Sequence, residues 1–312
     1  MVKHKILAVV GPTASGKSAL ALELAKRLNG EIISCDSMQI YKRMNIGTAK
    51  PTETEMAEIP HRMIDVAEPT DSYSCAEYVA AATDAIERCV AAGKLPIVCG
   101  GTGLYLDALL RKNDFEPETG DESVRKELME YAETKGAEAL WSILNEIDPE
   151  SAAATHMNNI KRVARAIEIY RVSGITKTEL DRHSREGGDR YDACVVGLRY
   201  SDRETLYNRI NKRVDTMISE GLVEETEKLM AEGVFEKNAT AAQAIGYKEL
   251  FGYIRGEESL ADASERLKTS TRRYAKRQMT WFGAKDYVRW VEADKKTFED
   301  IVNIATELFK KS

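Results

Sequence analysis

The stretch that decides the fold is Gly11-Pro12-Thr13-Ala14-Ser15-Gly16-Lys17-Ser18, which fits the phosphate-binding pattern G-x-x-x-x-G-K-[ST]. A short apolar run, Ile6–Val10, precedes it, and an amphipathic pattern, Ala19–Leu28, follows it. These flanks predict a strand, a P-loop and a helix. Backbone N–H groups of the loop are expected to surround phosphate oxygens, with Lys17 neutralising their charge and the Ser18 hydroxyl binding Mg²⁺. The motif alone does not distinguish a nucleotide from a pyrophosphate ester.

Working outward from the loop, short apolar runs alternate with helical patterns, which is typical of a doubly wound parallel sheet. The expected strands are Ile6–Val10, Glu31–Ser34, Met63–Val66, Leu95–Cys99, Cys194–Leu198 and Tyr287–Val291. Residues 121–182 carry only helical periodicity. We therefore expect an α/β, P-loop NTPase-like core domain from residues 1–115 and 191–312, interrupted by an all-helical insertion domain at residues 116–190. The charged, glycine-containing segment His183–Asp192 is expected to be the loop that leaves the insertion.

Composition narrows the class of protein. The 312 residues carry a net charge of −6 and contain no uncharged apolar run long enough to span a membrane or to serve as a signal peptide, so we expect a soluble cytoplasmic protein. The five cysteines lack metal-site spacing, and buried free thiols are expected. No feature indicates an obligate protein partner. Charge is uneven, however: residues 114–150 hold twelve acids against three bases, whereas residues 266–285 hold seven bases and no acid.

Polar residues follow two of the expected strands, where ligands of open α/β sheets bind. Asp36 is placed to act as a general base or to hold a metal ion, but it or Ser37 could equally cap a helix beginning near Met38. The turn Gly100-Gly101-Thr102-Gly103 allows backbone and a hydroxyl to approach a ligand closely. A kinase or ATPase would normally place a metal-binding carboxylate there, and Asp65 on a neighbouring strand is the available substitute.

Six separated blocks of sequence resemble the tRNA dimethylallyltransferase (tRNA isopentenyltransferase) family. Besides the P-loop they are DSMQIYKRMNIGTAKP at 36–51, HRMIDV at 61–66, GGTGLY at 100–105, AIGYKE at 244–249 and TRRYAKRQMTWF at 271–282, with supporting matches LYNRINKRVDTM at 206–217 and SVRKEL at 123–128. Their order along the chain makes the resemblance specific, whereas a P-loop alone fits many families.

The resemblance implies transfer of a dimethylallyl group from dimethylallyl pyrophosphate to the N6 amine of the adenosine 3′-adjacent to the anticodon, with release of pyrophosphate. The adenosine must be flipped out of the anticodon loop to react. The resemblance makes Asp36 the general base and places Thr102 against both substrates, with Lys17 and Mg²⁺ at the departing pyrophosphate. Both Ser18 and Asp36 are candidate Mg²⁺ ligands.

The resemblance also implies a set of tRNA contacts in the anticodon stem-loop. These are Asp36, Ser37, Met38, Gln39, Thr102, Arg125, Lys161, Arg162 and Arg165. Position 161 departs from the family pattern, which usually has Gln there; this weakens the expectation of a base contact while keeping phosphate attraction.

Two further basic groups come from the C-terminal half. Arg209 and Arg213 share a helix face and either point toward pyrophosphate, where Arg213 joins the P-loop, or pair with Asp202 or Asp215. The stripe Lys268, Arg272 and Lys276, with Arg273 and Arg277 beside it, has no acid in its own segment, so we expect it to lack acidic partners. We expect Arg272, Arg273 and Lys276 to contact the RNA backbone.

Three alternatives remain open at this point. A small-molecule kinase could use the same P-loop with ATP, a nucleotide-dependent RNA-binding module could lack chemistry, and a related prenyltransferase could act on free adenine nucleotides. The insertion and the basic C-terminal block favour tRNA as the substrate.

Overall fold

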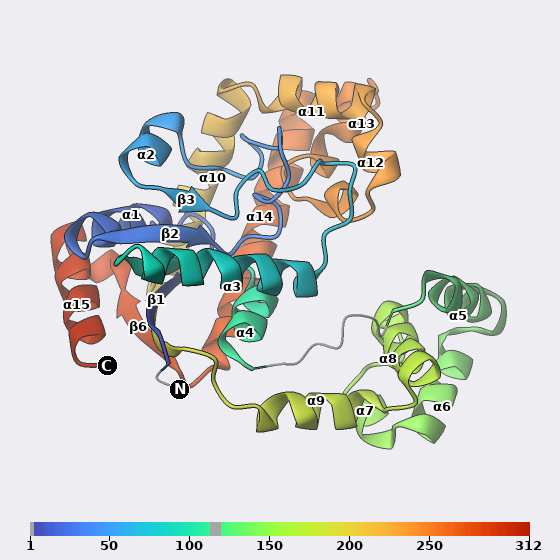
Figure 1. Ribbon diagram of the computed structural model, residues 1–312. Coiled ribbons are helices and arrows are strands. Elements are labelled where there is room, and N and C mark those ends of the chain that lie inside the picture. Colours follow the sequence, from blue (N-terminus) through green and yellow to red (C-terminus); the bar gives the residue numbers. More distant parts are fainter. Residues whose placement is uncertain (1–2, 113–119) are drawn as a thin grey trace. The chain divides into compact units, whose positions relative to one another are not determined.

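The computed structural model describes residues 3–112 and 120–312, without the side chains of residues 184–186. The chain divides into two compact units (Figure 1), one formed by Met1–Leu110 with Tyr191–Ser312 and the other by Arg111–Arg190. The sequence placed the corresponding borders at 115/116 and 190/191. The first of these predicted borders lies outside the described residues.

A six-stranded, all-parallel sheet in the order β3-β2-β4-β1-β5-β6 forms the centre of the first unit. Its strands are β1 (Lys5–Val10), β2 (Gly30–Ser34), β3 (His61–Arg62), β4 (Leu95–Gly100), β5 (Asp192–Arg199) and β6 (Val288–Glu292). The apolar run of β1 is buried along almost its whole length because helices cover both sheet faces. This confirms the predicted doubly wound α/β fold.

Helices α1 (Lys17–Arg27) and α15 (Phe298–Lys310) cover one sheet face, and α3 (Cys75–Ala91) and α4 (Gly103–Leu110) pack on the other. The remaining helices of this unit are α2 (Glu53–Glu58), α10 (Arg203–Ser219), α11 (Leu222–Ala231), α12 (Val234–Lys237), α13 (Phe251–Ile254) and α14 (Leu260–Gly283), with short 3₁₀ turns at Ala241–Gln243, Lys248–Leu250 and Ala293–Lys295. Figure 1 shows α14 as a long helix running beside α10, as their shared apolar contacts require.

One predicted strand is wrong. Residues 63–66 do not continue β3, because Met63 and Asp65 take left-handed backbone angles (φ 63° and 56°) that no strand tolerates. The chain instead turns sharply after Arg62, and the Lys50 ammonium binds the Asp65 carboxylate at 2.5 Å. The turn ends the strand after two residues.

The second unit is helical, as predicted. Its helices are α5 (Glu122–Lys135), α6 (Ala137–Ile147), α7 (Pro149–Ala153), α8 (Ile160–Ser173) and α9 (Lys177–Glu186). Leu128, Leu140, Leu144, Val163 and Ile167 are fully or almost fully buried and form a core of their own. The segment expected to be an exit loop from His183 begins inside α9, because the Thr176 capping box starts a helix that runs on to Glu186.

All five cysteines are free thiols, four of them buried and Cys75 half-buried, which confirms the expectation of unpaired cysteines. Among the helices of residues 3–112 and 120–312, none combines the length and apolar character that crossing a bilayer requires.

Candidate active site

The P-loop residues form the turn between β1 and α1 that the motif predicts. Gly11, Ala14 and Gly16 all have positive φ angles, which wrap the loop around the N-terminus of α1. A side chain at Gly11 would also collide with the Leu198 carbonyl, 2.8 Å from where its Cβ would lie. Glycine at this position is therefore required by both backbone angle and space.

Three side chains from distant parts of the sequence form hydrogen bonds with the backbone of this loop. The Arg209 Nε donates to the Ala14 carbonyl at 2.9 Å, and the Tyr200 hydroxyl donates to the Ser15 carbonyl at 3.3 Å. The Thr13 N–H donates to the Gln278 side-chain oxygen at 2.8 Å. Arg209 thus faces the P-loop, and the alternative of surface pairing with Asp202 or Asp215 is wrong for it.

Two cations, Lys17 and Arg213, line a cavity at the mouth of this loop. Burial lowers the pKa of Lys17, and the neighbouring Arg213 lowers it further. Burial likewise lowers the pKa of Arg213, although the Asp36 carboxylate opposes the shift. The Asp36 carboxylate acts on both cations, but it does not overcome the effect of burial on either. A site that desolvates two cations in this way favours an anionic ligand.

Asp36 follows β2 in a hydrogen-bonded turn, and no helix begins near Met38. Its Oδ1 accepts the N–H groups of Met38 and Gln39 at 2.9 and 3.4 Å, whereas no hydrogen bond from the described part of the chain ends on Oδ2. The helix-cap interpretation is therefore wrong, although the carboxylate does cap this turn. The Thr102 Oγ1 accepts the Ser37 N–H at 3.0 Å, so a residue that follows the neighbouring strand β4 supports this turn.

The glycine turn after β4 is tightly packed against its neighbours. A Cβ at Gly100 would lie 2.0 Å from the Cys35 carbonyl oxygen, and one at Gly101 would lie 2.0 Å from the Gln278 side-chain nitrogen. That nitrogen donates to the Gly101 carbonyl at 3.0 Å. The buried Gln278 amide therefore ties the glycine turn to the P-loop.

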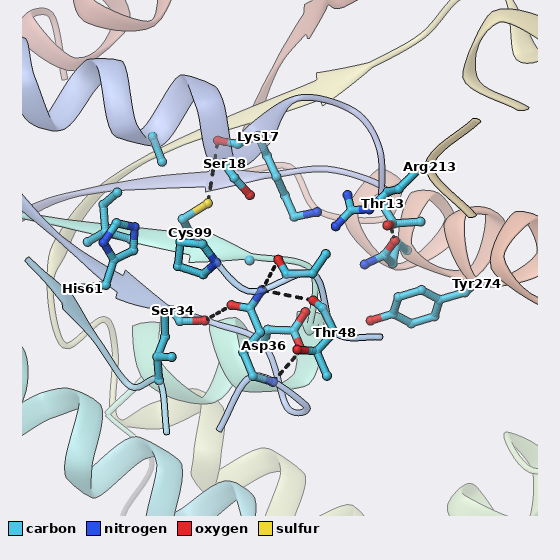
Figure 2. Close-up of a pocket in the computed structure, with 18 residues that line it drawn as sticks. Thr13, Lys17, Ser18, Ser34, Asp36, Thr48, His61, Cys99, Arg213 and Tyr274 are labelled. Carbon is cyan, nitrogen blue, oxygen red and sulfur yellow. Dashed lines mark hydrogen bonds between the residues drawn. The ribbon is translucent and has the colours of Figure 1, made fainter. Parts of the chain in front are cut away.

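Two cavities meet at this point. The first contains the P-loop side chains Lys17 and Ser18, and the second opens between the Asp36 turn and α14. Six residues line both cavities and form a common wall: Thr13, Asp36, Thr48, Ala49, Arg213 and Tyr274. Figure 2 shows the Tyr274 hydroxyl pointing toward Asp36. A ligand in each cavity would therefore meet the other beside the Asp36 carboxylate.

Asp65 takes no part in this site. It forms an ion pair with the nearly buried Lys50 and does not line the first cavity. The carboxylate that a kinase would need at the neighbouring strand is therefore engaged elsewhere.

The four basic residues of the second unit that were predicted to contact tRNA fall into two pairs. Arg125 and Arg165 both bind the fully buried Glu168 carboxylate, at 2.9 and 3.0 Å. Lys161 and Arg162, at the start of α8, are exposed. Arg125 and Arg165 therefore neutralise a buried acid, and their contact with tRNA stays a prediction.

The basic stripe on α14 is less uniform than its sequence indicates. Lys268 pairs with Asp215 at 2.6 Å and Arg272 pairs with Glu265 at 2.9 Å, so the prediction that the stripe lacks acidic partners is wrong for these two. Asp215 comes from α10, and Glu265 lies two turns earlier on α14. Arg273 and Lys276 are exposed.

Two residues of the site were not among the candidates taken from the sequence. Tyr274 and Gln278 lie within the quoted block at 271–282, but nothing in that block distinguishes them from its other polar side chains. Burial raises the pKa of Tyr274 far above its usual range, so its phenol stays protonated.

The family model described as IPP transferase matches residues 39–285. A tRNA dimethylallyltransferase of Acetivibrio thermocellus is 50% identical over 289 residues, covering 93% of this chain and 92% of its own. One from Halalkalibacterium halodurans is 45% identical and is covered in full, as is this chain.

Solved structures agree with the sequence comparison. The tRNA delta(2)-isopentenylpyrophosphate transferase of Staphylococcus epidermidis is 42% identical with a TM-score of 0.72, covering 99% of this chain and 100% of its own. A eukaryotic dimethylallyltransferase acting on tRNA is 29% identical with a TM-score of 0.83, covering 99% of this chain and 80% of its own. The chain belongs to the IPP transferase family.

Proposed function

We propose that this protein is a tRNA dimethylallyltransferase, which transfers a dimethylallyl group from dimethylallyl pyrophosphate to the N6 amine of the adenosine 3′-adjacent to the anticodon. The observation that supports this most strongly is the common wall of the two cavities. A pyrophosphate donor in the first cavity and a flipped base in the second would bring carbon and nitrogen together beside Asp36.

The donor's pyrophosphate fits the cation-lined end of the first cavity. The negative charge of the phosphates would there replace the solvation that Lys17 and Arg213 have lost through burial. The dipole at the N-terminus of α1 would add to this attraction. Arg209 and Gln278 keep the P-loop in the geometry that receives the phosphates. The same contacts would stabilise the charge that develops on pyrophosphate as it leaves.

In the reaction, the adenine N6 atom forms a bond to C1 of the dimethylallyl group while the bond from C1 to the pyrophosphate oxygen breaks. The bonding electrons leave with pyrophosphate, and the N6 proton passes to the Asp36 carboxylate. Because the hydrogen bonds of Asp36 end on Oδ1, Oδ2 is the oxygen placed to accept that proton. Thr102 would act through the Ser37 N–H by holding this turn in place.

A magnesium ion fits the donor set of the first cavity. The Ser18 hydroxyl and the Asp36 carboxylate both line it and are hard oxygen donors, which Mg²⁺ prefers together with phosphate oxygens. When bound, the ion would neutralise charge on the leaving pyrophosphate.

The proposed tRNA surface includes the Asp36–Gln39 turn at the second cavity and the exposed cations of α14. Lys161 and Arg162 would add phosphate contacts from the second unit, with Arg125 and Arg165 contributing the part of their charge that Glu168 leaves available.

The test is incubation with radiolabelled dimethylallyl pyrophosphate, Mg²⁺ and unmodified tRNA, with AMP and ATP offered as competing acceptors. We expect label in tRNA at the adenosine 3′ to the anticodon and none in the free nucleotides. Label in AMP instead would identify a prenyltransferase of free nucleotides, and phosphate transfer from ATP without prenyl transfer would identify a kinase.

A further inference from the structure

The first cavity has two chemically different ends. Lys17 and Arg213 form a cationic end beside the P-loop, and His61 lies at the opposite end (Figure 2). Burial lowers the pKa of His61 and outweighs the opposing contact between its Nδ1 and the Ile59 carbonyl oxygen at 2.7 Å, which favours the neutral ring. Burial raises the pKa of the nearby Cys99 thiol to about 11, which keeps it uncharged as well.

Most polar side chains at this neutral end are already bonded within the protein. The Ser34 hydroxyl donates to the Gln39 side-chain oxygen at 2.8 Å. The Gln39 amide nitrogen in turn donates to the carbonyls of Thr48 and Ala49 at 3.2 and 3.1 Å. This end of the cavity therefore offers a ligand chiefly surface that needs no hydrogen bond.

Apolar side chains also line this cavity, namely Ala21 from α1, Ile32 from β2 and Ile64 from the turn after β3. Ile32 is paired with His61 in the register of β2 and β3, and Ile64 follows His61 by three residues, which places both at the neutral end. Ile64 is flanked on both sides by left-handed residues, Met63 and Asp65. Such backbone strain persists only where the surroundings fix it, and it is common at ligand sites.

The turn that carries Ile64 is held by three further contacts. The Lys50 ammonium binds the Asp65 carboxylate and the Tyr41 carbonyl, and the Asp65 N–H donates to the Gln39 carbonyl at 3.2 Å. The block at 61–66, which the sequence marked as a strand, is thus a braced turn that places an isoleucine in the cavity wall. A braced side chain gives little room to a longer ligand.

We propose that Ile32 and Ile64, together with Ala21, set the length of prenyl chain that the enzyme accepts. This rests on the proposed function, because it assigns the cationic end to the donor's pyrophosphate and the neutral end to its hydrocarbon tail. The neutral end admits one isoprene unit and excludes the second unit of a ten-carbon donor by overlap with the two isoleucines.

The test compares dimethylallyl and geranyl pyrophosphate as donors to unmodified tRNA. Replacing Ile64→Ala together with Ile32→Ala removes more carbon atoms than one isoprene unit adds. We expect the ratio of geranyl to dimethylallyl kcat/KM to rise by about tenfold or more, the range in which apolar pockets discriminate chain length. The control is Val66→Ala, on the same turn but 44% exposed, which should leave the ratio unchanged.

A second variant covers the case in which the double variant does not fold. Ala21→Val adds carbon to the cavity wall and should raise the KM for dimethylallyl pyrophosphate by about tenfold, while inhibition by inorganic pyrophosphate, which has no tail, stays within twofold of the wild type.

The outcomes separate the two proposals. An unchanged donor ratio in the folded double variant, or equal loss of donor and pyrophosphate binding in Ala21→Val, would overturn the chain-length assignment. Failure of the wild type to prenylate tRNA with either donor would instead count against the proposed function.

Discussion

Single residues of the donor site are arranged for a ligand and not for stability. Burial lowers the pKa of both Lys17 and Arg213; Arg213 lowers that of Lys17 further, Arg209 lowers that of Arg213, and Asp36 only partly offsets these shifts. Groups that perturb each other in this way are common at functional sites, because the ligand supplies the missing charge. The free protein therefore carries a destabilising cost that, in our proposal, the donor's pyrophosphate relieves.

Replacing Lys17→Met should test that cost. We expect the variant to lose donor binding and yet to unfold at a higher temperature, because an apolar side chain of similar length needs no desolvated charge. Each kcal/mol gained would raise Tm by about 2–4 °C in a protein of this size class. Thermal unfolding of the donor-free protein measures it.

The pH dependence gives this prediction a sign. The folded-state pKa of Lys17 lies below its unfolded value of 10.5. Between these two pKa values the unfolded chain binds more protons than the folded one, so the wild type gains stability as the pH rises through this range. The advantage of Lys17→Met should therefore shrink at alkaline pH. Lys310→Met, at an exposed position of α15, is the control that should show neither effect. A lower Tm for Lys17→Met would mean that the ammonium stabilises the fold.

At the scale of elements, the sequence predicted the parts of the molecule that local patterns specify. Five of the six expected strands match observed strands, because the sequence of a buried parallel strand is a short apolar run. The run Met63–Val66 is also apolar, but its two left-handed residues form a turn, and Ile64 within that turn lines the first cavity. Backbone strain of this kind depends on tertiary contacts such as that of Lys50, which no local pattern reveals.

The same limit applies to the site. The P-loop and Asp36 follow strand ends and could be found from the sequence, because the carboxyl edge of a parallel sheet is where ligands bind. Gln278 and Tyr274 could not, since they reach the loop from a helix more than two hundred residues away in the chain. The acidic partner of Lys268 was missed for the same reason, because Asp215 belongs to α10.

Helix α14 carries the exposed cations Arg273 and Lys276, and these lead to a prediction about tRNA binding. Replacing Arg273→Gln and Lys276→Gln should weaken tRNA binding and flatten its dependence on salt by roughly 0.7–0.9 in log K against log salt per cation, because each phosphate contact releases counterions. Donor affinity should not change. Exposed cations on other helices, replaced as Arg88→Gln and Lys310→Gln, form the matched control.

The measurement is tRNA affinity across a salt series. Equal slopes for the α14 variant and its control would show that this face does not meet the RNA. Arg272→Gln differs from both, because the Arg272 guanidinium also bonds Asn211 and Glu265, so its loss should lower Tm as well as affinity.

At the scale of the whole molecule, the second unit has a hydrophobic core separate from those of the first, which predicts two separate responses to destabilising substitutions. Leu144 is fully buried in the core of the second unit, so Leu144→Ala should destabilise that unit by about 2–5 kcal/mol. The donor site lies entirely in the first unit and should keep its affinity. Calorimetry should show an early transition that dimethylallyl pyrophosphate leaves in place, and a later one that it raises. A single transition that the donor shifts as a whole would show that the units unfold together.

The most direct test of the central claim is the single-turnover rate of Asp36→Asn with both substrates bound. The amide keeps the shape of the carboxylate but cannot accept the N6 proton. We expect donor and tRNA affinities within a few-fold of the wild type and a rate of prenyl transfer lower by about 10²–10⁴-fold, the usual contribution of a general base. A transfer rate close to that of the wild type, with both substrates bound, would contradict the assignment of Asp36 as the base.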